Sequence, residues 1–288
     1  MQKKATDDDT GRFYESGDGL KLFYRDYASG RNGTPVLCLP GLTRNSRDFE
    51  DIAVHLCATR RVVTPDLRGR GFSAHDPEWR NYHPGTYVKD VRRLLDELGI
   101  DRTIVIGTSL GGLIAMVMAK LDAARLAGVV LNDIGPEVAP AGLARIGAYA
   151  GRLPPVRSWS EAVSQTREIY GEWWPGLSDG QWIKMAWRAY REGADGVPRL
   201  DIDPGIGTAI RAVGAPSGDP WQAFDALHNT PTLVLRGERS DVLSEDILQR
   251  MRQRKPDLMT VTVANRGHVP LLDEPECIAA IDQFVGGL

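Results

Sequence analysis

Four short apolar runs in the first half of the chain constrain the fold more than any other feature. They lie at residues 35–41, 60–66, 103–109 and 126–133, and each has a short stretch of valine, leucine or isoleucine at its centre. A run that is apolar at nearly every position suits a strand buried on both faces, as in a parallel sheet covered by helices. A helical spacing of apolar residues occupies 86–100, between two of these runs. The alternation of strand and helix predicts a doubly wound α/β fold.

This alternation is interrupted between residues 136 and 219. That stretch shows helical patterns broken by "LPP", "WPG" and "DGVP", and no convincing strand. Apolar runs at 230–238 and 258–265 then predict further strands, and 244–254 and 274–285 predict helices. The sequence therefore predicts a core domain made of residues 1–135 and 220–288, with a helical lid inserted at 136–219.

Composition narrows the classes of function. The 288 residues carry a formal net charge of −3, and no long stretch is dominated by one sign, so nucleic-acid binding is not expected. The first residues lack the apolar stretch of a secretory signal, and no window approaches a membrane span, so we expect a cytoplasmic protein with no membrane contact. The three cysteines are widely spaced in apolar surroundings and are interpreted as reduced core residues. We expect no metal and no cofactor, and the oligomeric state stays open.

Ser109 is the candidate nucleophile. It stands in "GTSLGG", where a predicted strand enters and an apolar helix leaves. Gly107 and Gly111 would let the backbones approach closely, so that the serine hydroxyl stands at a strained corner on the carboxyl edge of the sheet. The backbone N–H of Leu110, at the start of the helix, would then face a developing oxyanion.

A serine hydroxyl needs a base, and His268 is the best placed of the five histidines. It directly follows the last predicted strand, so its loop leaves the same sheet edge as Ser109. The remaining histidines are interpreted as ordinary polar residues, because they lie before or within helices or in the loop 74–85; they are His55, His75, His83 and His228. The spacing of His75 and His83 does not support a metal pair.

The base needs a carboxylate that orients it, and three residues are candidates. Asp241 is favoured, because it lies past the end of the strand at 230–238, in a loop that can turn toward His268. Glu238 in the same loop is an alternative. Asp133, which ends the run 126–133 directly after "VVLN", is a remoter one.

The second oxyanion donor is expected in the loop after the run at 35–41. There Gly41 allows close approach, and the N–H of Leu42 is the natural partner of the N–H of Leu110. The next strand is followed by "PDLRGRGFS", in which Asp66 and Arg68 are expected to brace these loops rather than take part in chemistry.

Together these stretches resemble the α/β-hydrolase superfamily, over nearly the whole chain outside 136–219. The matching motifs are "PGL", "PDLRGRGFS", "GTSLGG", "RGERSDVL" and "RGHVPLLDEP". The resemblance implies an eight-stranded, mostly parallel sheet with helices on both faces, a helical lid after the sixth strand, and a triad in the order Ser, Asp, His. Within the superfamily, the chain most resembles the lidded serine esterases and enol-lactone hydrolases. The chain departs from many relatives in having Pro40 where they have histidine before the oxyanion glycine.

The resemblance implies a serine hydrolase that cleaves a carboxylic ester or lactone of a small, partly apolar molecule through an acyl-enzyme. A serine at position 109, where relatives that act on haloalkanes have aspartate, disfavours dehalogenation. Two alternatives remain: a carbon–carbon bond hydrolase of dienoic or diketone ring-fission products, and a non-catalytic protein that binds a small ligand on the same scaffold. In the lid, the residues 181–193 have two apolar stripes, so this helix is expected to line a pocket as well as pack. The arginines of the predicted lid are candidates for holding a substrate carboxylate, and the sequence does not single out one of them.

Overall fold

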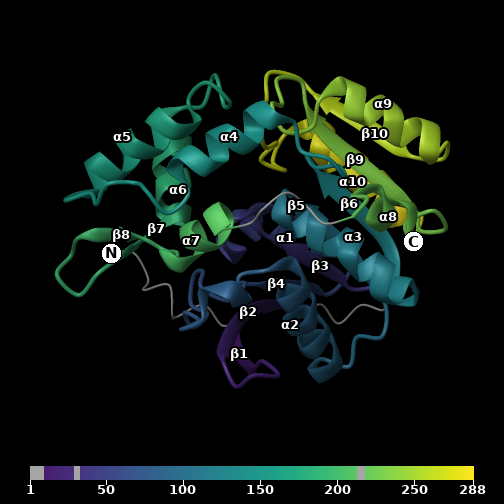
Figure 1. Cartoon of the computed structure of the whole chain (residues 1–288), viewed down its shortest axis with the longest axis horizontal. Helices are drawn as coiled ribbons and strands as arrows, with labels where there is room; N and C mark the ends of the chain where they lie inside the picture. Colours follow the sequence, from purple (N-terminus) through teal and green to yellow (C-terminus); the bar gives the residue numbers. More distant parts are fainter. Residues whose placement is uncertain (1–9, 29–32, 213–217) are drawn as a thin grey trace.

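A computed structural model describes residues 10–28, 33–212 and 218–288. Its main feature is an eight-stranded sheet in the order β1-β2-β4-β3-β5-β6-β9-β10 (Figure 1). The strands are β1 (Gly11–Glu15), β2 (Lys21–Tyr27), β3 (Val36–Leu39), β4 (Val62–Pro65), β5 (Thr103–Thr108), β6 (Leu126–Asn132), β9 (Thr232–Gly237) and β10 (Met259–Val263). β2 pairs antiparallel with both β1 and β4, and every other pairing in this sheet is parallel.

The order of the strands places the candidate nucleophile at a switch point. From β3 the chain moves outward to β4 and then returns to the other side of β3 to form β5. The loops after β3 and β5 therefore leave the same edge in opposite directions, and such a crevice is where open α/β sheets bind ligands. Ser109 directly follows β5, and Gly41 follows β3.

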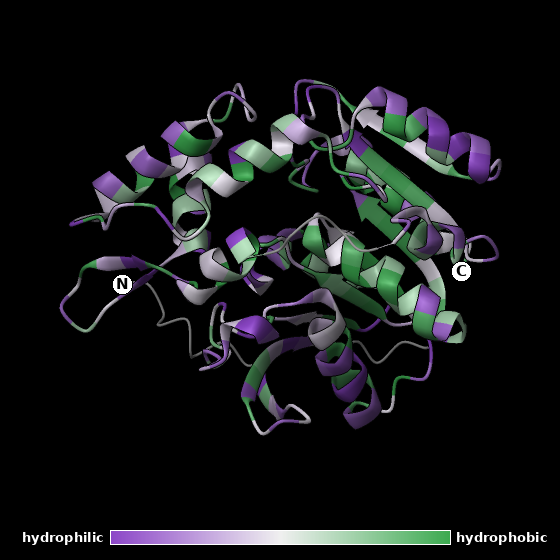
Figure 2. Cartoon of the chain, in the orientation of Figure 1, coloured by the Kyte–Doolittle hydropathy of each residue, from purple (hydrophilic) through white to green (hydrophobic). Residues whose placement is uncertain are grey.

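Helices cover both faces of the sheet. α1 (Glu50–Leu56) and α10 (Pro275–Gly286) pack on one face, and α2 (Pro84–Glu97), α3 (Leu110–Asp122), α8 (Trp221–Asp225) and α9 (Glu245–Arg254) pack on the other. Successive β3 residues alternate between the two cores: Val36 belongs to the α1 side and Leu37 to the α3 side. Both are fully buried, which explains the continuously apolar runs (Figure 2). The expected eight-stranded, mostly parallel sheet with helices on both faces is confirmed.

Between β6 and β9, which are neighbours in the sheet, the chain forms an inserted segment, defined here as Pro140–Ala212. It contains α4 (Pro140–Tyr149), α5 (Trp159–Tyr170), α6 (Asp179–Ala189), β7 (Tyr190–Glu192), β8 (Pro198–Leu200) and α7 (Gly205–Ala212). α5 and α6 lie side by side, away from the main sheet (Figure 1).

The prediction that this segment contains no strand was wrong. We expected no strand there, but β7 and β8 pair as an antiparallel hairpin, and Gly196 in its turn has a φ of 76°. A strand of three residues is too short to produce a visible alternation of apolar and polar residues. The hairpin also ends α6 at Ala189, although the apolar pattern continues to Tyr190. β1 at the sheet edge is a further strand that the apolar runs did not predict.

No helix in the described ranges is both long and apolar enough to cross a membrane.

Candidate active site

Ser109 occupies a strained turn between β5 and α3. Its φ of 51° and ψ of −112° lie outside the regions that a residue with a side chain ordinarily adopts. Close backbone contacts hold it there: a Cβ on Gly111 would lie 2.0 Å from the carbonyl oxygen of Leu39, and one on Gly107 would lie 2.5 Å from the carbonyl carbon of Gly111. The expectation that these two glycines let the backbones meet is confirmed. The turn is therefore the tight strand-to-helix corner that the sequence predicted.

Replacing Gly111 with alanine tests this packing. The Cβ would meet the backbone of β3, which cannot move aside as a flexible side chain can, so we expect the free energy of unfolding to fall by about 1–3 kcal/mol or more. Gly180→Ala in α6 is the matched control, because nothing lies within 4 Å of its added Cβ. That change should leave stability unchanged or raise it by up to about 1 kcal/mol. Urea unfolding of the two variants measures both effects, and equal stabilities would contradict the packing described here.

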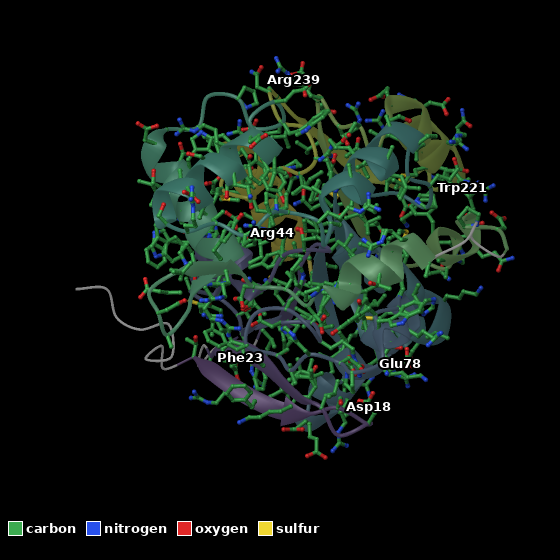
Figure 3. All side chains as sticks on the ribbon, turned by 60° about the vertical axis from the view of Figure 1, so that its left-hand side comes forward. Asp18, Phe23, Arg44, Glu78, Trp221 and Arg239 are labelled. Atoms are coloured by element: carbon green, nitrogen blue, oxygen red, sulfur yellow. The ribbon has the colours of Figure 1, made fainter. Side chains whose placement is uncertain are left out.

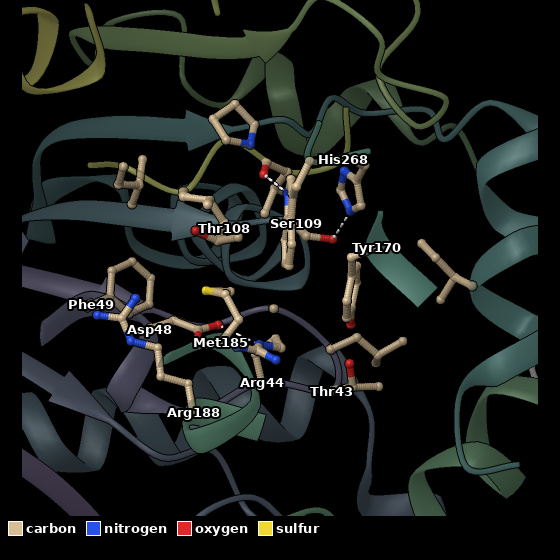
Figure 4. A pocket seen from close by; sticks show the side chains of 18 of the residues that line it. Thr43, Arg44, Asp48, Phe49, Thr108, Ser109, Tyr170, Met185, Arg188 and His268 are labelled. Carbon is tan, nitrogen blue, oxygen red and sulfur yellow. Dashed lines mark hydrogen bonds and ion pairs between the residues drawn. The ribbon is translucent and has the colours of Figure 1, made fainter. Parts of the chain in front are cut away.

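His268 lies beside Ser109, as expected. Its Nε2 is 2.9 Å from Oγ of Ser109, and the side chain is largely buried (Figure 4). The loop that carries His268 follows β10 and is held by the inserted segment: Gly267 N–H donates to the carbonyl of Trp173, and Nε1–H of Trp174 donates to the carbonyl of Val269. The position of the base thus depends on both the sheet and the inserted segment.

Asp133, and not Asp241, is the carboxylate that contacts His268. Oδ2 of Asp133 is 2.8 Å from Nδ1 of His268 and also accepts the hydroxyl of Ser240, while Oδ1 accepts the N–H of Gly237. The side chain is fully buried, and its φ of 56° turns it back over the edge of the sheet. The remoter alternative from the sequence is therefore the residue that the structure places in this position.

The preference for Asp241 was wrong for a physical reason. The backbone turn at Glu238 and Arg239 is pinned to the end of β10, since Glu238 N–H donates to Val263 and Arg239 N–H to Arg266. The chain then leads Asp241 away to α4, where its carboxylate receives two hydrogen bonds from Arg145, at 2.7 and 2.8 Å. Glu238, the other alternative, accepts the N–H of Asn265.

The loop after β3 lies against Ser109. A Cβ on Gly41 would lie 3.9 Å from Cβ of Ser109, and Leu42 lines the same cavity as Ser109. The carbonyl of Leu42 accepts a hydrogen bond from Nε of the fully buried Arg70, at 3.0 Å, which fixes the orientation of this peptide. Leu110 is the first residue of α3, so its N–H has no acceptor within the helix. The two predicted oxyanion residues thus flank Ser109.

Two buried residues brace these loops, as expected. Asp66 accepts the N–H of Ser46 at 2.7 Å and of Phe72 at 2.8 Å, tying the loop after β3 to the loop after β4. Arg68 forms ion pairs with three aspartates away from the cavity: Asp18, Asp76 and Asp90. Arg70, which the sequence argument did not single out, makes the direct contact to Leu42.

A cavity opens next to Ser109 and His268, with a largely apolar and aromatic wall (Figure 4). The inserted segment contributes Tyr149, Tyr170, Trp174 and Met185. The rings of Tyr170 and Trp174 stack with their centroids 4.4 Å apart. The expectation that the helix at 181–193 lines a pocket is confirmed by Met185, which is buried on the face of α6 toward the cavity.

Charged residues also line this cavity: Arg44, Asp48 and Arg188. Arg44 is buried and lies near the middle of the view in Figure 3, whereas Asp18 and Arg239 lie toward its outline. Burial disfavours the charge of Arg44, but Asp48 more than offsets this through two hydrogen bonds, so the pKa of Arg44 is raised. Arg188 is the arginine of the inserted segment that reaches the cavity among the described residues. Arg44 was missed, because it lies outside that segment in a loop assigned only to oxyanion binding.

The remaining candidates lie elsewhere. His55 contacts Asp282, and His83 caps α2 through the N–H of Gly85. Cys38 and Cys277 are buried, and burial raises the pKa of both thiols. Within the described ranges, no three histidine, cysteine, aspartate or glutamate side chains are grouped so that they could hold a metal ion.

This arrangement allows His268 to take a proton from Ser109. A hydroxyl at a strained corner, an imidazole within hydrogen-bond distance and a buried carboxylate on the other ring nitrogen are the parts needed to activate a serine.

Comparison with known proteins agrees with this geometry. Residues 34–275 match the model of a family described as the alpha/beta hydrolase fold. The chain is 32% identical over 280 residues to a 3-hydroxybutyrate-oligomer hydrolase from Cupriavidus necator, covering 93% of each chain.

Two solved structures are similar to this chain over nearly its whole length. A crystal structure of an alpha/beta hydrolase from Novosphingobium aromaticivorans superposes with a TM-score of 0.92 at 42% identity, over 96% of this chain and 98% of the other. A crystal structure of a protein from Rickettsia typhi superposes with a TM-score of 0.84 at 26% identity, over 94% of this chain and 92% of the other.

Proposed function

The chain belongs to the α/β-hydrolase family, and on that premise we propose that it is a serine hydrolase that cleaves a carboxylic ester through an acyl-enzyme on Ser109. The observation that carries the proposal is the continuous contact from Ser109 to His268 and from His268 to Asp133, at 2.9 and 2.8 Å, beside an open cavity. A packing turn or a receptor for a small ligand has no need of all three groups in this arrangement.

The proposed reaction has two halves. His268 takes the proton of Ser109 on Nε2 as Oγ attacks the ester carbonyl, and the resulting imidazolium is stabilised by Asp133. The tetrahedral intermediate collapses when His268 returns the proton to the leaving alkoxide, which departs as an alcohol. Water then attacks the acyl-enzyme with His268 again as the base, and Ser109 regains its proton as the carboxylic acid leaves.

The N–H groups of Leu42 and Leu110 would stabilise the negative oxygen in both tetrahedral intermediates. Each such donor contributes on the order of 10²- to 10³-fold to the rate in enzymes of this kind. The hydrogen bond from Arg70 to the carbonyl of Leu42 holds that peptide in place, and the dipole of α3 favours negative charge near Leu110.

The inserted segment supports the substrate side of the proposal. We assign the described part of the segment predicted at 136–219 as a lid, because Tyr149, Tyr170, Trp174 and Met185 form the apolar wall of the cavity; residues 213–217 of that prediction lie outside the described residues. Such a wall favours a substrate with an apolar part. The similarity to a 3-hydroxybutyrate-oligomer hydrolase suggests a candidate, a short oligoester of a hydroxy acid.

A panel of purified substrates tests the proposal. We expect turnover of short acyl esters and of hydroxybutyrate oligoesters, followed by release of acid. Turnover of lactones alone would shift the substrate class within the same mechanism. Hydrolysis of ring-fission diketones without any ester hydrolysis would instead support carbon–carbon bond cleavage, and binding without turnover would support a receptor.

A further inference from the structure

We propose that Arg44 and Arg188 form a carboxylate-binding subsite in the active-site cavity, so that the ester substrate carries a free carboxylate. The inference rests on the proposed ester hydrolysis and identifies the class of its substrate. It starts from two buried guanidinium groups that line the same cavity as Ser109 and still have donors without an acceptor.

Arg44 is held by one carboxylate and keeps one nitrogen free. Its Nε and Nη2 donate to the two oxygens of Asp48, at 2.7 and 2.6 Å. Its Nη1 is buried, and no atom of the described residues accepts a hydrogen bond from it. The residue is 8% exposed, so bulk water does not satisfy this donor well. A ligand oxygen in the cavity would do so.

Arg188, which also lines the cavity, shows the same combination of one ion pair and one unpartnered nitrogen. Its Nη2 donates to Asp51 at 2.9 Å, and its buried Nε has no acceptor in the part of the chain that the structure describes. The residue is 5% exposed and lies on α6. Its backbone is fixed to the loop that carries Arg44, because Asn45 donates to the carbonyl of Arg188 at 2.9 Å.

An unpartnered buried donor is not by itself the mark of a binding site, because, among the described residues, Arg60 and Arg145 also have one and do not line the cavity. Arg68 lies away from the cavity, and its Nε, Nη1 and Nη2 all donate to aspartate carboxylates. Arg70 does have an unpartnered Nη2, but it does not line the cavity. Arg44 and Arg188 combine a free buried donor with a place on the cavity wall (Figure 4).

The charge balance favours an anion. The wall carries two guanidinium groups against the single carboxylate of Asp48, and Asp51, which neutralises part of Arg188, lies outside the wall and is partly exposed. Guanidinium groups bind carboxylates through charge-assisted hydrogen bonds, which are stronger in a cavity with little water. A neutral carbonyl could accept from the same free donors, but it would lack this charge assistance.

The subsite is also close enough to act on the reacting ester. Cγ of Arg44 and Cβ of Ser109 lie 3.7 and 3.9 Å from the same point, the position that a Cβ on Gly41 would take. Because Arg44 and Ser109 also line one cavity, we place a carboxylate held by Arg44 on the same small molecule whose ester group lies over Ser109. It would orient that ester and so contribute to kcat/KM.

Two matched pairs of probes test this inference. The first compares the mono-4-nitrophenyl ester of glutaric acid with 4-nitrophenyl pentanoate, so that the carboxylate is on the acyl side. The second compares 3-butyryloxybutanoate with its methyl ester, so that the carboxylate is on the alcohol side. We expect the wild-type protein to prefer the acid in at least one pair, and Arg44→Met to lower the acid-to-neutral ratio of kcat/KM by about 10- to 100-fold in that pair.

Three further variants separate binding from folding. Arg44→Met with Asp48→Asn removes both charges together, so it avoids leaving Asp48 unpaired and should show the same lowered ratio. Arg188→Met should lower the ratio as well. Arg157→Met is the control, because Arg157 is 89% exposed in its side chain and pairs with Glu161 on the lid surface. It should leave the ratio unchanged.

The possible failures are distinct. A general distortion of the oxyanion loop would lower turnover of acid and ester equally, and the unchanged ratio would overturn the subsite. Equal turnover of acids and neutral esters by the wild-type protein would overturn it too, while leaving ester hydrolysis intact. Absence of turnover of every probe would overturn the proposed function itself.

Discussion

Replacing Ser109 with alanine is expected to lower kcat for ester hydrolysis by about 10⁵-fold or more. The variant keeps the cavity, His268 and the backbone N–H groups of Leu42 and Leu110, but it has no oxygen with which to form the acyl-enzyme. Slow residual turnover should remain, because oxyanion stabilisation and binding survive the loss of a triad member. Initial rates with 4-nitrophenyl butyrate measure the change.

Ser160→Ala is the control for this substitution. Ser160 is an exposed residue near the start of α5 and does not line the active-site cavity. The Ser160→Ala variant should hydrolyse the ester at the wild-type rate, and circular dichroism should show that both variants are folded. Wild-type turnover by a folded Ser109→Ala protein would mean that another group performs the reaction.

Replacing Asp133 with asparagine is expected to lower kcat by about 10⁴-fold. The single amide oxygen would be retained by the N–H of Gly237, which leaves the NH₂ group facing His268 and Ser240. His268 would then accept a hydrogen bond on Nδ1 and hold its proton on Nε2. In that tautomer it donates to Ser109 instead of taking the serine proton.

Asp241→Asn gives the opposite result if the assignment is correct. Asp241 contacts Arg145 of α4 and not His268, so its replacement should change kcat by less than about tenfold. The loss of this ion pair, in which both side chains are mostly buried, should instead lower the melting temperature. A large loss of kcat in Asp241→Asn together with a mild one in Asp133→Asn would restore the acid that the sequence favoured.

The sequence was sufficient for the features that depend on local pattern. β3 is apolar at each position and β5 is apolar at its centre because both faces of these strands are covered, and this leaves a clear signal. The glycines around Ser109 could be interpreted from the motif alone, since the close contact of α3 with β3 leaves no room for a Cβ. His268 followed from its place after the last strand.

The acid could not be chosen from sequence because the choice depends on the path of a loop. Asp133 and Asp241 both follow strands at the carboxyl edge, and the deciding facts are the positive φ of Asp133 and the hydrogen bonds that turn Glu238 toward β10. Long-range contacts of this kind leave no periodic pattern. The same holds for Arg44, whose role depends on which side chains surround its guanidinium.

The central claim is that Ser109 is the nucleophile of an acyl-transfer site. Its most direct test is labelling with a fluorophosphonate, which phosphonylates an activated serine with loss of fluoride, followed by mass spectrometry of the intact protein and of its peptides. The account predicts a single adduct, located on Ser109, that is absent in Ser109→Ala and forms much more slowly in Asp133→Asn. An adduct on another residue, or an unlabelled protein that still hydrolyses esters, would contradict it.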